Sequence, residues 1–187
     1  MRKKKQPVYL LKVTLKGTDP SVWRRFQVPA DVSLYRLHTL LQAVMGWTNS
    51  HMHMFTIDGV DYGKPRAERG IFGRVIKDER RTKLNRVVPQ EGMTFDYEYD
   101  FGDSWQHLIE VEKILPPEGP SRAVCFAGAG ACPPEDCGGI GGYEELLEAI
   151  ADPQHPRHEE LTEWLGEKFD PEAFDVEQVN QYLQGIA

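Results

Sequence analysis

Long apolar runs are missing from this sequence, and none approaches the roughly 18 residues that a membrane-spanning helix requires. Residues 1–7 are basic, but the apolar stretch after them is short, contains Lys12 and offers no small-residue cleavage site, so we expect no signal peptide. Cysteine is scarce, with three among 187 residues. These absences predict a cytoplasmic protein whose cysteines are reduced thiols or metal ligands, and they argue against a disulfide framework.

Acidic residues are scarce in the first half of the chain, and basic residues are scarce in the second half. Residues 1–90 contain 18 Lys and Arg but only 7 Asp and Glu, whereas residues 91–187 contain 4 and 22. The overall net charge of −7 therefore conceals +11 and −18. Such a division is found in nucleic-acid-binding proteins with an acidic segment, but it also arises when two halves pack together and neutralise each other. We favour the second interpretation, because the acidic half also carries core-forming helices.

Periodic apolar residues outline the elements of one domain, residues 1–187, in which 40% of residues are hydrophobic. The predicted strands are residues 8–15, 22–28, 51–57, 94–101 and 105–115. A helix follows Ser33, a good N-cap, and ends at Gly46. Three further helices are predicted near Tyr143, Pro156 and Asp175. The remainder consists of a basic connector, 64–86, and a Cys-, Pro- and Gly-rich segment, 116–142, for which we expect a loop.

This order of elements predicts an α+β fold. We expect a mixed, mainly antiparallel sheet packed on one helix, a β-grasp-like core over residues 8–115. The loop 116–142 would then lead to a C-terminal three-helix extension, residues 143–187. This topology is predicted by analogy with ubiquitin-like folds.

The cysteines form the first candidate site. Cys132 and Cys137 have a spacing suited to zinc ligands, and Cys125 and His107 could complete a tetrahedron, with His155 or His158 as weaker alternatives. Such an ion would be structural, because four protein ligands leave no open position. The alternative is that the cysteines are small buried apolar residues. We favour this alternative, since only one close cysteine pair is present.

A second candidate site lies around the predicted hairpin, where Asp100, Asp103 and His107 could hold a catalytic divalent ion. Strand alternation places His107 on the core face and Asp100 on the polar face, and Asp103 falls in the turn. Turn residues and a buried histidine are therefore the favoured interpretation. His51 and His53 could join this cluster, although a half-buried pair packed on aromatic residues is the simpler account.

The basic connector is the third candidate, a surface for DNA or RNA phosphates. Its cations are Lys64, Arg66, Arg69, Arg74, Lys77, Arg80, Arg81, Lys83 and Arg86, and Trp23, Trp47 and Phe72 could stack on bases. The alternative is a solvated loop that contacts the acidic helices, since a basic run without a docking motif is weak evidence.

Several motifs together resemble the plasmid pRiA4b ORF-3-like family. They are Val22-Trp23-Arg24-Arg25, residues 37–47, residues 51–55, the run Tyr99 to His107 and the run Cys132 to Gly139. Similar proteins occur on plasmids and as transposon passengers, and some are labelled resolvases. Arginine-flanked nucleophiles of a recombinase are not evident here, because Arg24 and Arg25 would point to opposite faces of a strand.

The leading hypothesis from the sequence is therefore a non-enzymatic interaction module that binds nucleic acid through its basic half. A metal-dependent hydrolase or nuclease built on Asp100, Asp103 and His107 is the alternative. A third possibility is an adaptor that binds another protein through its acidic C-terminal helices.

Overall fold

Eight strands form a single sheet in the computed structural model, which describes residues 6–65, 75–116, 122–166 and 168–186. Their order is β5-β4-β3-β6-β7-β1-β2-β8, and all neighbours are antiparallel except β4 and β5. The strands are β1 (Val8–Leu15), β2 (Trp23–Pro29), β3 (His53–Ile57), β4 (Val60–Gly63), β5 (Lys77–Asp78), β6 (Thr94–Tyr99), β7 (Trp105–Leu115) and β8 (Val124–Ala129).

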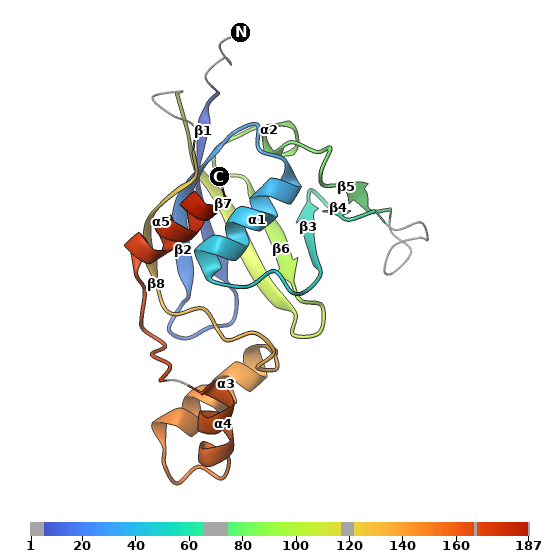
Figure 1. Cartoon of the computed structure of the whole chain (residues 1–187). Helices are drawn as coiled ribbons and strands as arrows, with labels where there is room; N and C mark the ends of the chain where they lie inside the picture. Colours follow the sequence, from blue (N-terminus) through green and yellow to red (C-terminus); the bar gives the residue numbers. More distant parts are fainter. Residues whose placement is uncertain (1–5, 66–74, 117–121, 167, 187) are drawn as a thin grey trace.

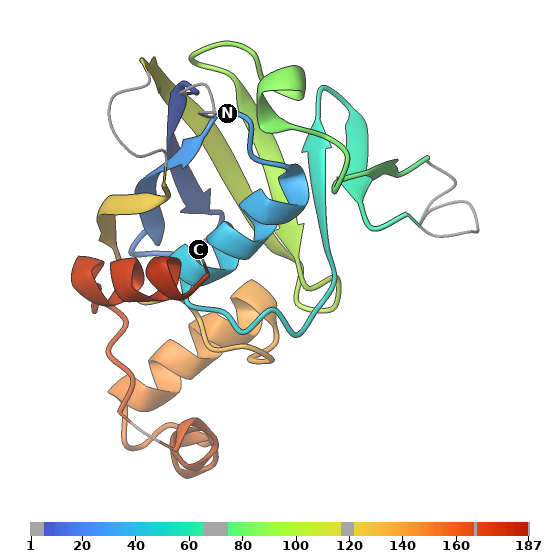
Figure 2. The same cartoon turned by 45° about the horizontal axis from the view of Figure 1, so that its top comes forward.

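The helices occupy two places. In Figure 1, α1 crosses one face of the sheet with α5 beside it, while α3 and α4 project beyond one end of the strands. Figure 2 shows the same separation from a second direction. None of the helices in the described ranges combines the length and apolar composition of a membrane span. The helices are α1 (Leu34–Met45), α2 (Leu84–Val87), α3 (Gly139–Ala151), α4 (His158–Leu165) and α5 (Val176–Gly185).

This architecture corrects the predicted β-grasp-like core with its three-helix extension. The α+β class holds, but the sheet has eight strands, and α5 packs on α1 and β8 instead of belonging to a separate extension. The predicted loop 116–142 contains β8, whose short run of small residues gives no alternation signal. Asn180 of α5 accepts from the Cys125 amide (2.8 Å) and donates to its carbonyl (2.9 Å), which satisfies the outer edge of this strand.

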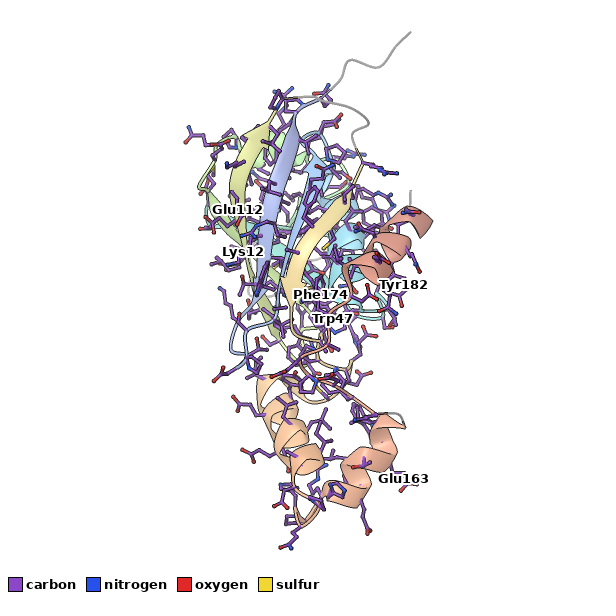
Figure 3. The ribbon with its side chains drawn as sticks, turned by 90° about the vertical axis from the view of Figure 1, so that its left-hand side faces the viewer. Lys12, Trp47, Glu112, Glu163, Phe174 and Tyr182 are labelled. Carbon is purple, nitrogen blue, oxygen red and sulfur yellow. The ribbon has the colours of Figure 1, made fainter. Side chains whose placement is uncertain are left out.

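One face of the sheet forms the core with α1. Alternation along residues 94–101 predicts one buried face for Phe95, Tyr97, Tyr99 and Phe101. The first three are 3%, 0% and 0% exposed, whereas Phe101 lies beyond the end of β6 and is only half-buried. Leu34, Leu37, Leu41 and Val44 of α1 are fully buried as well. On the side of the sheet away from α5 lie Lys12 and Glu112, as Figure 3 shows. The burial of these apolar side chains thus determines which face of the sheet carries α1.

The ends of α1 are well defined. Ser33 Oγ accepts from the Arg36 amide (3.2 Å), which confirms the predicted N-cap, and Gly46 adopts the left-handed conformation that ends the helix. Arg24, 3% exposed, reaches from β2 and donates from Nε to the carbonyl of Val44 (2.9 Å). A cation at this position complements the negative end of the helix dipole.

Candidate functional site

Asp100 lies in the turn between β6 and β7. Its φ of 55° breaks the alternation that places it on the polar face, and the residue is only 8% exposed. Its amide donates to the Met52 carbonyl (2.8 Å), and its Oδ1 accepts from the Gly102 amide (2.9 Å). The turn therefore holds the carboxylate beside the strand that follows His51.

His51 lies between two carboxylates. Its Nδ1 is 3.6 Å from Oδ2 of Asp100, and its Nε2 is 3.1 Å from Oδ1 of Asp136. Nε2 is buried, and no group in the described ranges meets it with hydrogen-bond geometry. One ligand atom from each of these residues lies within 4.8 Å of the others. One imidazole and two carboxylates suit a divalent cation and leave positions for water or substrate.

The loop that carries Asp136 is held against the sheet by aromatic side chains. Trp47 Nε1 donates to the Pro133 carbonyl (3.0 Å), and the Tyr99 hydroxyl donates to Glu135 Oε1 (2.5 Å). Burial and the Glu135 carboxylate raise the pKa of Tyr99 above its usual range, so the phenol keeps its proton. Asp136 has a φ of 61° and a side chain that is 70% exposed.

Two glycines shape this loop, and one of them allows it to approach the β6–β7 turn. A Cβ on Gly139 would lie 2.4 Å from the carbonyl oxygen of Asp103, and one on Gly142 would lie 1.9 Å from that of Cys137. Only glycine fits at either position. Oδ2 of Asp103 accepts from the Gly138 amide (3.1 Å). Asp103 therefore joins the two loops and brings Asp136 towards Asp100.

A pocket of about 480 Å³ lies beside this cluster, and His51 is shared between the two. Its size is typical of small-molecule sites. Histidines, sulfur-containing and aromatic side chains, and two cations form its wall. The lining residues are Tyr35, His38, Asn49, His51, Met52, His53, Met54, Gly63, Lys64, Ile76, Glu79, Arg80 and Phe101.

Two lining residues of the pocket, His38 and Asn49, form a closed ring of hydrogen bonds with Gln42 and Tyr97. The Asn49 amide N–H donates to Gln42 Oε1 (2.9 Å), so Gln42 Nε2 donates to the Tyr97 hydroxyl (3.0 Å). Tyr97 then donates to His38 Nδ1 (2.8 Å), and His38 Nε2 donates to Asn49 Oδ1 (2.7 Å). The backbone N–H of Asn49 therefore fixes the direction of every bond in the ring. It also fixes the His38 tautomer and the orientation of the Asn49 side-chain amide.

His38 supports a second histidine of the pocket. Burial, and to a smaller extent His53, lowers the pKa of His38 to about 3, so the ring is neutral as the hydrogen bonds require. His53 stacks on it at a centroid distance of 3.4 Å and an interplanar angle of 6°. His53 Nε2 lies 2.7 Å from Oε2 of Glu79, whose side chain is 3% exposed. Both partners are thus held in place.

The predicted catalytic cluster is only partly assembled. Asp100 belongs to the site, but its neighbours there are His51 and Asp136, not Asp103 and His107. Asp103 bonds to a backbone amide. His107 is fully buried, its Nδ1 donates to the Tyr97 carbonyl (3.2 Å), and burial lowers its pKa to about 4. Asp136 was missed by sequence reasoning, although it lies in the run Cys132 to Gly139 that carried the family resemblance.

The predicted zinc ligands do not converge in the described ranges, where the group of three or more possible ligands is His51, Asp100 and Asp136. Cys125 lies on β8, with its thiol 3.6 Å from the Arg25 carbonyl. Burial raises the pKa of Cys137 to about 12 and that of Cys132 further. Zinc at Cys125, Cys132, Cys137 and His107 stays a prediction, without support from this geometry.

The basic connector lies partly outside the described residues, which omit Arg66, Arg69 and Arg74. Four of its other cations already lie over an aromatic ring or beside a carboxylate. Lys77 lies over Tyr62 (5.7 Å), Arg80 over Tyr35 (4.3 Å), Arg81 pairs with Asp78 (3.4 Å) and Lys83 with Asp31 (3.4 Å). Of these cations, Arg80 lines the pocket, as does Lys64 from the start of the connector.

Comparison with known proteins gives relatives along almost the whole chain. The family described as plasmid pRiA4b ORF-3-like protein matches residues 7–178. The uncharacterised protein y4hQ of Sinorhizobium fredii is 44% identical over 182 residues, which are 96% of this chain and 92% of the relative. A crystal structure of MM3350, a protein of unknown function from Methanosarcina mazei Go1, has a TM-score of 0.81 and 38% identity, and the match covers 92% of this chain and 97% of that one.

Proposed function

This chain belongs to the plasmid pRiA4b ORF-3-like family, and we propose that it is a divalent-metal-dependent hydrolase of phosphate esters. The observation that carries the proposal is the approach of His51, Asp100 and Asp136 to within 4.8 Å, at the margin of the 480 Å³ pocket. Three protein ligands would leave open positions on the ion, which a catalytic metal requires. The site replaces the Asp100, Asp103 and His107 cluster predicted from sequence.

The chemistry follows from the charges around the pocket. A divalent ion held by His51, Asp100 and Asp136 would offset the two aspartates, polarise a phosphoryl oxygen and make a bound water more acidic. Hydrolysis would join the water oxygen to phosphorus and break the bond from phosphorus to the ester oxygen. One water proton would pass to the departing alcohol, and the other would stay with the phosphate. Lys64 and Arg80 in the pocket wall favour an anionic substrate.

Metal binding is the first test. We expect elemental analysis of protein dialysed against Mn²⁺ or Zn²⁺ to give one ion per chain, and calorimetry to give an affinity that Asp100→Asn lowers about tenfold or more. Asparagine tolerates the left-handed φ and keeps an oxygen for the Gly102 amide, so the turn should persist. Asp103→Asn is the matched control, because its carboxylate lies in the same turn but outside the ligand group.

Activity is the second test, with bis(p-nitrophenyl) phosphate as the probe. We expect hydrolysis that needs the added ion and is lost in Asp100→Asn but retained in Asp103→Asn. Absence of ion binding, or equal affinities in the two variants, would contradict the metal site. The same elemental analysis on Cys132→Ser tests the zinc prediction, because an ion at the cysteines would be lost in that variant only.

Nucleic-acid binding through the basic half is the second candidate function. It is favoured by one observation, that two cations of the connector, Lys64 and Arg80, line the same pocket. Counterion release predicts that binding to single-stranded DNA or RNA weakens steeply with salt. Lack of binding at low salt in a fluorescence-anisotropy titration would count against this candidate.

A further inference from the structure

We infer that the pocket beside the metal cluster takes a nucleotide, with the phosphate towards Lys64, Arg80 and the ion, and the base in the apolar part. The inference rests on the proposed function for the role of the ion, and it names the substrate class. Two properties of the wall support it, the planar apolar surfaces and the fixed polar groups between them.

The apolar part of the wall suits a flat ring. Phe101, Met52 and Met54 line the pocket together with the ring of Tyr35. The exposed guanidinium of Arg80 stacks on Tyr35 at 4.3 Å, so a cation and an aromatic face are presented as one unit. Nucleobases stack on such surfaces whatever their sequence, and arginine adds a cation–π contribution.

The polar atoms of the wall are fixed before any ligand binds. Because the side-chain Oδ1 of Asn49 accepts from His38, the side-chain nitrogen Nδ2 is the group left to donate to a ligand. Glu79 is held by His53, and a buried carboxylate accepts from an amino group of the kind that adenine and cytosine carry. The pocket thus offers a donor and an acceptor at set positions, which a bare phosphate would leave unused.

The phosphate end is marked by charge. Lys64 and Arg80 are exposed, and His51 connects the pocket to the two aspartates that would hold the ion. A substrate with a phosphate at one end and a planar base at the other would contact both parts of the wall at once. Inorganic phosphate or a sugar phosphate would contact only the first part.

The test is a calorimetric comparison of AMP, CMP, ribose 5-phosphate and inorganic phosphate, with and without Mn²⁺. Stacking on aromatic side chains predicts that the mononucleotides bind about tenfold more tightly than ribose 5-phosphate. Arg80→Gln should weaken AMP binding by about tenfold, because it removes both the phosphate contact and the stacked cation. Arg86→Gln is the matched control, an exposed cation of the same connector that does not line the pocket.

The outcomes separate this inference from the proposed function. Nucleotide binding without any ion binding would sustain the inference and refute the metal-dependent hydrolase. Ion-dependent hydrolysis of the model diester, together with equal affinities for AMP and ribose 5-phosphate, would refute the inference alone. Equal losses of affinity in Arg80→Gln and Arg86→Gln would refute it as well.

Discussion

Two groups of polar residues contribute to the lining of the same pocket. In the ring of Gln42, Tyr97, His38 and Asn49, each donor meets an acceptor and the direction of every bond is determined. In the cluster of His51, Asp100 and Asp136, two acceptor groups face a histidine whose Nε2 has no hydrogen-bond geometry to either. The bonds of the first group close on themselves, whereas the second group presents two carboxylates that suit a cation.

Polar groups that stabilise this fold and polar groups that could bind a ligand differ in how far their hydrogen bonds are completed. A buried network whose bonds are all made rigidifies the protein, and breaking it leaves costly unpaired groups. A cluster of like charges at the margin of a pocket is stabilised only by a counter-charge. We therefore expect substitutions in the ring to change stability, and substitutions in the cluster to change ion binding.

The largest effect is expected for Gln42→Leu. This change leaves the Asn49 backbone amide without its acceptor and takes one donor from the fully buried Tyr97 hydroxyl, which keeps its bond to His38. We expect the free energy of unfolding to fall by about 3 kcal/mol in urea denaturation. Gln106→Leu, which removes an exposed bond to Ser104, should change it by less than about 0.5 kcal/mol. Equal losses of unfolding free energy in Gln42→Leu and Gln106→Leu would show that the buried ring does not stabilise the protein more than an exposed bond does.

A smaller effect is expected from pH, through the buried histidines. Burial lowers the pKa of His107 to about 4 in the folded protein, against an ordinary value of 6.5. Below pH 6.5 the unfolded chain therefore binds a proton that the folded chain does not, so stability is lost as the pH falls. Between pH 7 and pH 5 the loss from this residue is about 2 kcal/mol.

His107→Gln tests the origin of that loss. Glutamine can still donate to the Tyr97 carbonyl but does not titrate, so the free energy of unfolding should depend less steeply on pH by up to one proton. His38, with a pKa of about 3, contributes with the same sign and remains in the variant. An unchanged pH dependence in urea denaturation would show that His107 is already protonated in the folded protein.

The smallest effect on stability is expected for Asp103→Ala, in the same turn as Asp100. The change removes the bond to the Gly138 amide, and we expect a loss of about 1 kcal/mol in the free energy of unfolding. Because Asp103 also holds the loop that carries Asp136, we expect the ion affinity measured by calorimetry to fall in Asp103→Ala, but by less than in Asp100→Asn. A loss as large as that of Asp100→Asn would place Asp103 among the ligands after all.

Much of the fold follows from local sequence patterns. Alternation located β1, β6 and β7, and the Ser33 and Gly46 signals located both ends of α1. Alternation of apolar residues did not reveal β4, which is short, or β8, which is rich in small residues, because both carry little period-two signal. The one-helix sheet was wrong because α5 returns to the sheet through Asn180, a contact between residues 55 positions apart.

The candidate site was predictable only in part. Asp100 was found because carboxylates near a histidine suggest metal chemistry, but strand parity assigned it to the wrong face. Parity assumes extended backbone, and Asp100 has a φ of 55°. Asp136 could not be placed, since its approach depends on the contact of Gly139 with the Asp103 carbonyl and on the bond from the Gly138 amide to Asp103, 35 positions away.

By itself the sequence determined the α+β class, the aromatic core face of β6 and the family, because these depend on side-chain periodicity and on motifs read along the chain. Only the tertiary structure decided that His51 meets Asp100 and Asp136, and that His107 does not. The reason is that left-handed turns and glycine contacts redirect side chains over distances that periodicity cannot register, and burial then determines which polar atoms find partners.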